Sequence, residues 1–365
     1  MNLSKLSFIV TDDCNFACSY CMQHKEKNTI AWETITQAVD YFLPQTDSLE
    51  TLHIDFYGGE PLLAFNQVRF AMELITAKCW QRNQMVDFTL TTNGSLLTDA
   101  MLEFFNRYRL HLILSFDGLA QDVGRKPGSL TDTLEVVRRI HSYPGIQLEI
   151  NSVFTPKTIS VMAESVQFMI NYGLMDITLN FSGTESWESV GLDALSHELD
   201  KLCRYLRTYK QRTGVMPVSN FRGPAAGGGI FRCSAGQNQV AVSPLGQLWG
   251  CALFHDYFKN RKQDPQYEDY TLGTVYDVCV RQTGLEPRTV ANYMELRQNL
   301  FCAEDNPCFL CSSLNNCSVC PVNAAYSTQS IGAISAEKCA INRIVSDAQR
   351  KFHCHCQEAE TEHAS

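Results

Sequence analysis

The sequence predicts an α/β protein with a parallel sheet, followed by a cysteine-rich C-terminal region. Strand-like and helix-like segments alternate six times over the first 180 residues, which is the pattern of a parallel sheet with crossover helices. A Gly-rich break at 222–230 (RGPAAGGGI) follows, and a dense group of cysteines comes after it. With 365 residues the chain is too long for one compact core, so two domains are expected.

Six strands are expected where apolar or β-branched residues form nearly continuous runs, as in strands buried on both faces. Their ranges are 6–11, 51–57, 86–91, 110–116, 146–153 and 176–181. Amphipathic helical patterns lie between them, one capped by Asn28 or Thr29 and another capped by Thr98. Such repeats form either a partial barrel or an open, doubly wound sheet, and the pattern does not separate the two.

The chain divides into four expected parts. These are an α/β unit (1–220), a Gly-rich linker (221–231), a cysteine-rich unit (232–352) and a polar, frayed tail (353–365). The linker follows from three successive glycines after a proline, which cannot lie in a helix interior. Within the cysteine-rich unit the sequence predicts short turns until Ser335, which caps a last helix running to about Lys351.

Composition excludes several classes of function. The formal net charge is −9 and no Lys/Arg run has the density of a nucleic-acid footprint, so no nucleic-acid partner is expected. The N-terminal apolar run is too short for a signal peptide or a membrane span, which predicts a cytoplasmic protein without a membrane partner. Sixteen cysteines in such a chain indicate metal binding rather than a disulfide framework.

The first cysteine group, Cys14, Cys18 and Cys21, has the spacing C-x3-C-x2-C directly after the first expected strand. Three thiolates on one short loop can hold three irons of a [4Fe–4S] cluster, which normally takes four cysteines. The fourth iron then keeps an open position, as metal sites that do chemistry keep one. With the aromatic Tyr20 before the last cysteine, this run resembles the radical S-adenosylmethionine (SAM) superfamily. A zinc site is the structural alternative for the triad taken alone.

A Gly-Gly-Glu run follows the second expected strand, at the strand end where barrel enzymes place their sites. Gly58 and Gly59 let the backbone approach a ligand closely, and Glu60 can pair with the ammonium of SAM. At this distance after the cysteines, the run resembles the SAM-binding motif of the superfamily. A strand-to-helix turn with a capping glutamate is the structural alternative.

Further SAM contacts are implied by the same resemblance. They fall at the ends of the third, fourth and fifth strands and just beyond, on Asn93, Ser115, Arg125 and Asn151. In relatives the serine and the arginine hold the ribose and carboxylate of SAM. The surrounding Asn-Gly and Asp-Gly pairs are also ordinary turn dipeptides. The resemblance favours the partial six-strand barrel over the doubly wound sheet.

The second cysteine group begins with Cys233, Gly246 and Cys251 in the pattern C-x12-G-x4-C. A C-x2-C-x5-C-x2-C run and one separate cysteine follow, at Cys308, Cys311, Cys317, Cys320 and Cys339. This region resembles the SPASM domain, which binds two auxiliary [4Fe–4S] clusters. The family pattern has C-x3-C at the end of the run where this chain has C-x2-C. The resemblance therefore implies three [4Fe–4S] clusters and SAM as cofactors.

The resemblance also implies interleaved auxiliary ligands. One cluster would take Cys308, Cys311, Cys317 and Cys339, and the other would take Cys233, Cys251 and Cys320. Cys302 is a candidate fourth ligand of the second set, or that iron stays open and binds substrate. Taken alone, the region could also hold zinc in separate tetrahedral sites. Of the other cysteines, Cys79, Cys203 and Cys279 fall in apolar patterns and are expected to pack.

Relatives with a SPASM domain mostly modify peptides or proteins, so the resemblance implies a peptide or protein substrate. The preferred function is a maturase that installs a carbon–carbon or thioether crosslink in a ribosomally made peptide. The alternative is a sulfatase-maturating, formylglycine-forming enzyme, in whose relatives an aspartate base directly follows a cluster cysteine. Here Ala252 follows Cys251, with Asp256 further on. The non-enzyme alternative is a zinc-binding or electron-carrier protein.

Two protein partners are implied as well. The chain begins directly with the first expected strand, so leader recognition would fall to the barrel mouth, the SPASM surface or a separate leader-binding protein. An electron donor such as flavodoxin or ferredoxin would reduce the cluster.

Overall fold

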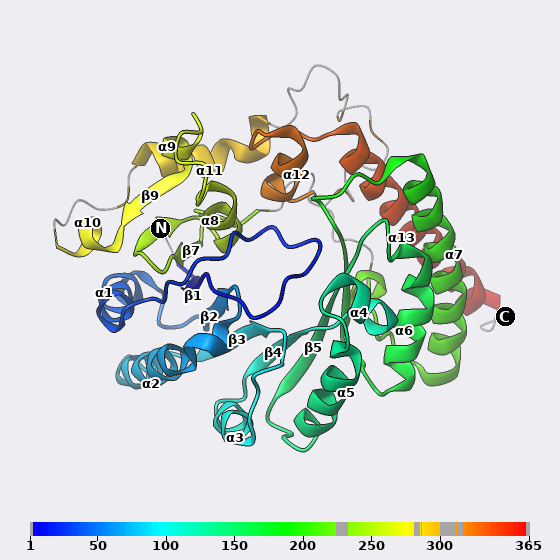
Figure 1. Ribbon diagram of the computed structural model, residues 1–365, viewed down its shortest axis with the longest axis horizontal. Helices are drawn as coiled ribbons and strands as arrows, with labels where there is room; N and C mark the ends of the chain where they lie inside the picture. Colours follow the sequence, from blue (N-terminus) through cyan, green and yellow to red (C-terminus); the bar gives the residue numbers. More distant parts are fainter. Residues whose placement is uncertain are drawn as a thin grey trace.

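A nine-stranded sheet forms the centre of the computed structural model, in the order β6-β5-β4-β3-β2-β1-β7-β8-β9 (Figure 1). The structure describes residues 3–223, 233–280, 285, 287–299, 308, 311, 317 and 319–362. Most of the expected Gly-rich linker, residues 224–231, therefore lies outside the described residues. No helix of the described part is long and apolar enough to cross a membrane.

Six parallel strands make up the first part of the sheet. They are β1 (Lys5–Thr11), β2 (Leu52–Gly58), β3 (Val86–Thr92), β4 (His111–Ser115), β5 (Gln147–Phe154) and β6 (Ile177–Phe181). Each expected strand is confirmed to within one residue at either end. The strands follow one another in chain order without reversal, whereas a doubly wound sheet reverses its order at a switch point. The sheet is therefore the partial barrel.

Helices cover the outer face of this curved sheet (Figure 1). They are α1 (Trp32–Phe42), α2 (Phe65–Gln81), α3 (Asp99–Arg107), α5 (Ser129–Ile140), α6 (Met162–Asn171) and α7 (Glu188–Thr213). The short α4 (Gln121–Gly124) instead follows the carboxyl end of β4, where the carbonyl of Gly124 accepts from the N–H of Ser19 at 2.9 Å. The expected cap at Thr98 is confirmed, because its hydroxyl accepts a hydrogen bond from the backbone N–H of Met101 at 3.3 Å. The expected cap of α1 at Asn28 or Thr29 is wrong, because α1 begins after Ala31.

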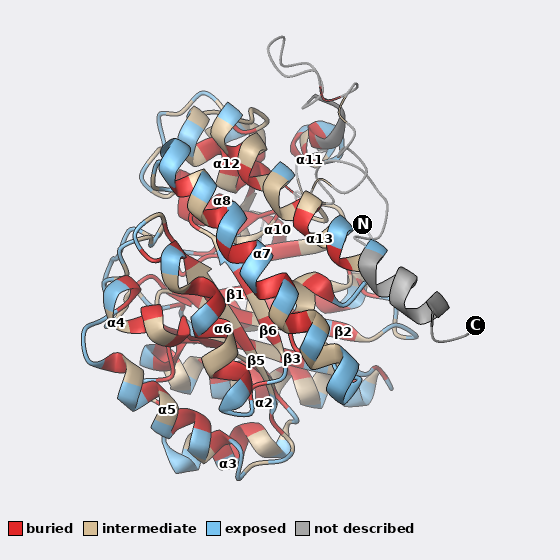
Figure 2. Ribbon diagram, turned by 90° about the vertical axis from the view of Figure 1, so that its right-hand side faces the viewer, coloured by how far each residue is buried: buried red, intermediate tan, exposed pale blue. Residues whose placement is uncertain are grey.

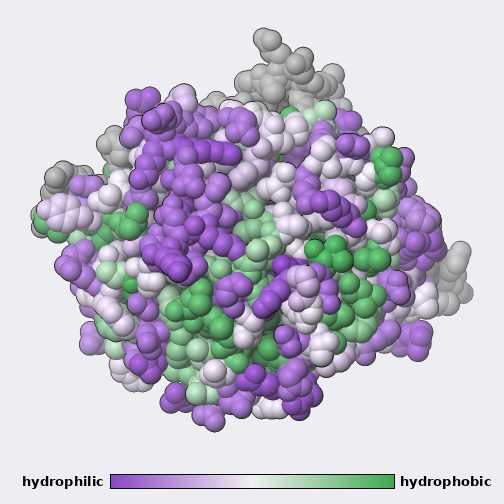
Figure 3. All heavy atoms as spheres, viewed as in Figure 1, coloured by the Kyte–Doolittle hydropathy of each residue, from purple (hydrophilic) through white to green (hydrophobic). Residues whose placement is uncertain are grey.

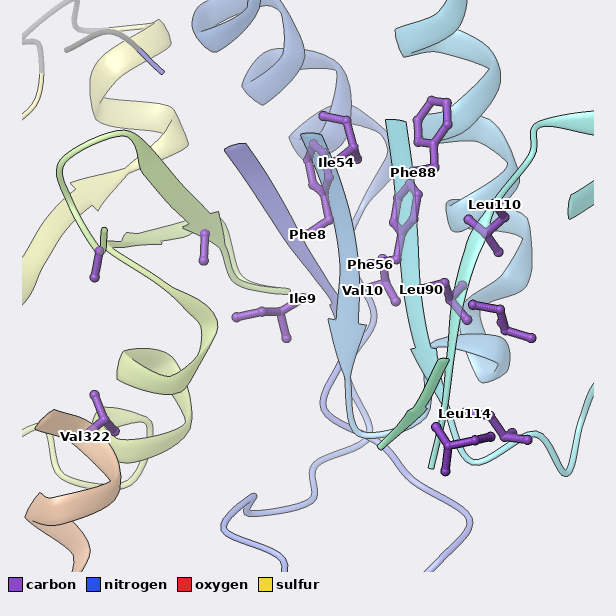
Figure 4. Packing of buried hydrophobic residues seen from close by; sticks show 14 of the residues in the cluster. Phe8, Ile9, Val10, Ile54, Phe56, Phe88, Leu90, Leu110, Leu114 and Val322 are labelled. Carbon is purple, nitrogen blue, oxygen red and sulfur yellow. The ribbon is translucent and has the colours of Figure 1, made fainter. Parts of the chain in front are cut away.

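The two faces of the sheet differ in polarity. Phe8, Phe56 and Phe88 lie in a row across β1, β2 and β3 under the helices, with neighbouring ring centroids 6.2 Å apart (Figure 4). On β2 to β6 the alternate residues face the inside and are mostly polar, with Ile113 and Val153 as apolar exceptions. Ion pairs such as His111–Glu149, at 3.0 Å, lie among them. The expectation of strands buried on both faces therefore holds for β1, whereas β2 has one buried face and one partly accessible face.

The cysteine-rich region continues the same sheet. Strand β7 (Gln239–Val242) pairs in parallel with β1, and β8 (Gln247–Trp249) and β9 (Thr271–Thr274) extend the sheet antiparallel. The hydrogen-bonded ladder thus crosses the expected boundary at 232. The remaining elements are α8 (Ala252–Phe258), α9 (Tyr267–Tyr270), α10 (Val275–Cys279), α11 (Pro287–Asn299), α12 (Pro321–Thr328) and α13 (Ala336–Glu362). The expectation of only short turns before Ser335 is therefore wrong.

The last helix, α13, lies alongside α7 and closes the far side of the barrel (Figures 1 and 2). Its cap at Ser335 is confirmed, since the hydroxyl accepts from the backbone N–H of Lys338 at 3.2 Å. The expected end near Lys351 is wrong, because the helix continues to Glu362 and includes most of the expected frayed tail. The added segment is rich in Glu, Gln and Ala, which are strong helix formers.

Candidate active site

A loop at 12–28, between β1 and α1, carries the first cysteine group. It crosses the carboxyl ends of the parallel strands, which is where barrel enzymes place their active sites (Figure 1). Within it the backbone N–H of Cys21 donates to the carbonyl of Cys18 at 3.2 Å, and that of Phe16 donates to the sulfur of Cys14 at 3.4 Å. We call this segment the cysteine loop.

The three thiols of the cysteine loop influence one another. Burial raises the pKa of Cys18 to about 11; Arg125 opposes this rise, and the charges of Cys21 and Cys14 add to it. Burial also raises the pKa of Cys14 and of Cys21. Thiolates gathered in this way need a cationic partner, which metal binding supplies as it displaces their protons. The donor set therefore fits a cluster held by three thiolates.

Among the described residues, no three His, Cys, Asp or Glu side chains are grouped as ligands of a single metal ion. A [4Fe–4S] cluster is instead ligated by one thiolate at each iron, so its sulfur donors stand apart around the cluster.

The end of β2 meets the cysteine loop backbone to backbone. The N–H of Gly59 donates to the carbonyl of Thr11 at 2.9 Å, and the N–H of Glu60 donates to that of Asp13 at 2.8 Å. A Cβ on Gly59 would lie 2.2 Å from the carbonyl oxygen of Asp13, and one on Gly58 would lie 2.2 Å from that of Thr11. Gly58 also has φ +143°, which side chains rarely adopt. Both positions therefore require glycine.

Glu60 is buried and fully engaged with its surroundings. Its carboxylate accepts from the N–H of Leu62 at 3.0 Å, the hydroxyl of Thr92 at 2.7 Å and the N–H of Asn93 at 2.8 Å. Burial raises its pKa. Glu60 is thus the capping glutamate that the sequence allowed, joining the ends of β2 and β3. Its pairing with the ammonium of SAM stays a prediction.

Asn93 joins the end of β3 to the cysteine loop. Its side-chain amide donates to the side-chain oxygen of Asn15 at 2.9 Å, and its own oxygen accepts from the N–H and hydroxyl of Ser95 at 3.0 and 2.6 Å. Asn15 lies directly after Cys14, so Asn93 positions the first cysteine whether or not it also contacts SAM.

Tyr20 and Arg125 meet at a buried carboxylate, Asp117. The Arg125 guanidinium binds both oxygens of Asp117, at 2.9 and 2.8 Å, and the Tyr20 hydroxyl donates to the same carboxylate at 2.8 Å. The guanidinium also lies 5.5 Å from the centre of the Tyr20 ring. The structure thus places both predicted residues at the cysteine loop, where they hold Cys18 and Cys21 through Tyr20. Their contacts with SAM stay predictions.

Ser115 and Asn151 lie opposite each other, in register on β4 and β5 at the mouth of the barrel. The carbonyl of Asn151 accepts from Arg125 at 3.1 Å, and its side-chain oxygen accepts from Asn180 at 2.6 Å. The structure therefore brings these two predicted SAM contacts into the neighbourhood of Arg125.

The C-terminal thiols form two separate groups. Burial raises the pKa of Cys251, and the charges of Cys233 and Cys320 raise it further. Burial also raises the pKa of Cys317, whose thiol is influenced by Cys339, Cys308 and Cys311. Although Cys317 and Cys320 are three residues apart, they belong to different groups, as the interleaved pattern implies. Cys302 lies outside the described residues, and the ligand roles stay predictions.

A second buried acid, Asp256, faces the cysteine loop from α8. It is 4% exposed and accepts hydrogen bonds from the hydroxyl of Tyr57 at 3.2 Å and the amide of Gln23 at 3.3 Å. Burial raises its pKa to about 6. Sequence reasoning noted Asp256 only for its distance from Cys251. Nothing in the local pattern indicates a contact with a tyrosine on β2.

The neighbouring residues of α8 clamp the start of the cysteine loop. Asp12 lies 3.0 Å from the ring nitrogen of His255 and 2.9 Å from the amine of Lys259. The amide of Asn28 donates to the same carboxylate at 2.9 Å. Although burial raises the pKa of Asp12, the hydrogen bonds from His255 and Lys259 bring it below its usual value. Sequence reasoning missed this ion pair, because its members are 243 residues apart.

Comparison with known proteins identifies a matching family and several relatives. A family model described as the radical SAM superfamily matches residues 8–169. The uncharacterized protein MJ0907 of Methanocaldococcus jannaschii is 30% identical over 209 residues, covering 55% of this chain and 70% of that protein. The radical SAM cyclopropyl synthase TigE of Paramaledivibacter caminithermalis is 23% identical over 288 residues, covering 71% of this chain and 59% of that enzyme.

Among solved structures, native anSMEcpe with bound AdoMet and the Kp18Cys peptide matches with a TM-score of 0.77 at 16% identity. The match covers 98% of this chain and 100% of that one. The fold is therefore shared over nearly the whole chain, including the cysteine-rich region.

We expect Gly59→Ala to destabilise the protein. The added Cβ would overlap the carbonyl of Asp13, and such overpacking costs roughly 1–3 kcal/mol. The matched control is Gly223→Ala, because nothing lies within 4 Å of a Cβ at that position. Anaerobic thermal unfolding of the iron-loaded proteins measures both. An unchanged unfolding midpoint for Gly59→Ala would contradict the close backbone approach.

We expect Asp256→Asn to stabilise the protein above pH 6 and to have little effect at or below about pH 4. Because the folded protein raises the pKa of this acid from 3.8 to about 6, its stabilising effect is fully present below pH 3.8 and is lost between pH 3.8 and pH 6. Asparagine keeps the hydrogen bonds and removes the ionisation, a gain of up to about 3 kcal/mol. Anaerobic unfolding at about pH 4 and pH 8 tests this, with the exposed Asp193→Asn as control. A difference independent of pH would rule it out.

Proposed function

This chain belongs to the radical SAM superfamily, and from that premise we propose that it is a peptide maturase. Its proposed reaction abstracts a hydrogen atom from a residue of a ribosomally made peptide and installs a carbon–carbon or thioether crosslink. The observation that carries this proposal is the grouping of seven C-terminal thiols into two interleaved sets, in a region clamped to the cysteine loop by Asp12 and His255.

The cysteine loop would hold the catalytic cluster through Cys14, Cys18 and Cys21. When bound, this reduced [4Fe–4S] cluster and SAM supply a 5′-deoxyadenosyl radical that can take hydrogen from an unactivated C–H bond. The glycine pair and Glu60 set the depth of the loop against β2 and β3. Asp117 fixes the loop from the other side through Tyr20, so the three thiols are preorganised before the cluster binds.

The C-terminal thiol sets would hold two auxiliary [4Fe–4S] clusters. Removal of a hydrogen atom leaves a substrate radical, and closing a crosslink then releases one further electron. An auxiliary cluster close to the cysteine loop is suited to accept that electron. The helix α8 begins directly after Cys251 and carries His255, which contacts the cysteine loop. This short path supports an electron-accepting role for the set that contains Cys251.

A peptide substrate is supported by one relative of the same fold, and carbon–carbon bond formation is supported by another. The solved structure of anSMEcpe, which shares this fold, holds a peptide together with AdoMet. TigE, which matches most of this chain, is a cyclopropyl synthase and so forms a carbon–carbon ring. In this chain the inner face of the barrel carries polar and charged side chains, which suit a peptide main chain better than an apolar ligand. A separate leader-binding protein belongs to the same proposal.

A sulfatase-type oxidation is the second candidate, and one observation favours it. In sulfatase-maturating relatives the base stands at the position that Ala252 occupies here. Asp256 lies one helical turn beyond Ala252, so both residues share a face of α8. Hydrazide labelling of the peptide product separates the two reactions. Formylglycine carries an aldehyde and reacts with a hydrazide, whereas a crosslinked peptide does not.

We expect Cys18→Ala to abolish SAM cleavage, because two thiolates cannot hold the catalytic cluster. The measurement is 5′-deoxyadenosine released by the anaerobically reconstituted, dithionite-reduced protein. Cys279→Ala is the matched control, since the thiol of Cys279 only donates to the carbonyl of Gln37. Cleavage by Cys18→Ala at the wild-type rate would refute the assignment, and zinc without iron in the wild-type protein would refute the cluster.

We expect Cys317→Ala to lose one auxiliary cluster, about four irons per chain, and with it the crosslinked peptide. SAM cleavage should persist, because Cys317 belongs to a thiol set distinct from the cysteine loop. Iron analysis and mass spectrometry of peptides encoded nearby provide the two measurements, again against Cys279→Ala. Retained iron together with unchanged peptide product would show that this thiol set has no cluster function.

A further inference from the structure

Two short segments carry basic residues in an otherwise acidic protein. Residues 24–27 (HKEK) and 259–262 (KNRK) contain five lysines and arginines and one glutamate, while the whole chain has a net charge of −9. The basic residues are Lys25, Lys27, Lys259, Arg261 and Lys262. The first segment lies in the cysteine loop and begins three residues after Cys21, and the second follows α8.

The fold brings these two segments together. The amine of Lys259 donates to the carbonyl of His24 at 2.6 Å and lies 3.7 Å from the carboxylate of Glu26. Lys25, Lys27 and Lys262 are exposed. A broad hydrophilic area covers the surroundings of α8 on the face that carries the cysteine loop (Figure 3). We call the two segments together the basic rim.

The basic rim borders an open cleft of about 670 Å³. Lys259, Arg261 and Lys262 line it, together with the acids Asp12, Glu26 and Asp264. Asp12 is neutralised by His255 and Lys259. One guanidinium nitrogen of Arg261 is buried and has no hydrogen-bond partner, and the group stacks 4.0 Å from the centre of the Tyr257 ring. The basic and acidic side chains that line the cleft therefore balance in number, and the excess positive charge beside the cysteine loop comes from the exposed Lys25 and Lys27 of the basic rim.

We propose that the basic rim is the docking surface for an acidic one-electron carrier protein, which reduces the cluster of the cysteine loop. The inference rests on the proposed function, because radical formation consumes one electron for each SAM cleaved. The carrier is oxidised by one electron, the cluster is reduced by one, and that electron breaks the carbon–sulfur bond of SAM. The rim lies on the loop that would hold this cluster, so a carrier docked there approaches it directly.

Charge, rather than shape, identifies the partner. Electron-transfer complexes are small and short-lived, and their rate depends on steering between opposite charges. An acidic carrier and this acidic chain would repel each other elsewhere, so a local basic surface decides where they meet. An acidic leader peptide would use the same chemistry, and the experiment below separates the two.

The test compares two reductants on one variant. Lys27→Glu/Lys262→Glu reverses two exposed charges of the rim, and Arg204→Glu/Lys351→Glu makes the same charge change on exposed residues of α7 and α13. Lys25 is left unchanged, because its charge opposes the burial that raises the pKa of Cys14 and Cys21. Release of 5′-deoxyadenosine is measured with reduced flavodoxin and, separately, with dithionite, which needs no docking surface.

We expect the rim variant to be roughly tenfold slower than wild type with flavodoxin at low ionic strength. The difference should shrink as salt screens the charges. With dithionite its rate should stay within about twofold of wild type, and the α7/α13 variant should behave as wild type with both reductants. Lys27→Gln/Lys262→Gln should show a smaller effect of the same kind, which guards against misfolding of the reversed variant.

Three results would overturn the proposal. The first is a rim variant that cleaves SAM with flavodoxin at the wild-type rate, and the second is a rim variant that loses equal activity with both reductants. The third is a rim variant that cleaves SAM normally with flavodoxin but no longer modifies the peptide, which would assign the rim to peptide binding. If wild-type protein with dithionite cleaves no SAM at all, the proposed function itself fails, and the docking surface fails with it.

Discussion

The backbone contact between the end of β2 and the cysteine loop is the constraint on which the site depends. Because Gly58 and Gly59 carry no Cβ, the last residue of β1 and the start of the loop can lie directly on the strand end, and the carbonyls of Thr11 and Asp13 accept two of its N–H groups. Side chains at these positions would push the loop away from the sheet, and the thiols of Cys14 and Cys18 would move with it. The glycine pair therefore sets the depth of the thiols in the barrel mouth, before any cofactor contact is considered.

Three further anchors fix the direction of the loop, and each uses a buried polar group. Asp12 binds α8, Asn93 binds Asn15, and Asp117 binds Tyr20 with Arg125. Buried ion pairs add little net stability, because desolvation offsets most of their attraction. Removing one partner is nevertheless destabilising, because it leaves the other charge buried without a partner. We infer that these pairs contribute specificity by allowing only one placement of the three thiols.

The sequence identified the elements of the site better than its connections. Strands and the cap at Thr98 are local patterns, and the structure follows them closely. Asp117, Asp12 and Asp256 were missed as anchors because their partners are 97, 243 and 199 residues away, so neither periodicity nor spacing records the contact. The prediction of the α1 cap was wrong for the same reason. Asn28 looked like a cap, but the structure uses it to bind Asp12. Local propensity yields when a distant partner offers a buried hydrogen bond.

Helix α8 is where the two halves of the protein become one site. Cys251 directly precedes this helix, His255 lies within it and Lys259 directly follows it, so one short segment carries an auxiliary thiol, the clamp on the cysteine loop and one residue of the basic rim. Asp256 is adjacent to His255 and behaves oppositely to Asp12. Burial raises the pKa of Asp256 although the charge of His255 opposes the rise, whereas the hydrogen bonds from His255 and Lys259 lower the pKa of Asp12. The α8 segment thus pairs with the carboxylate of Asp12 and adds a buried acid of raised pKa to a site that already gathers several thiols.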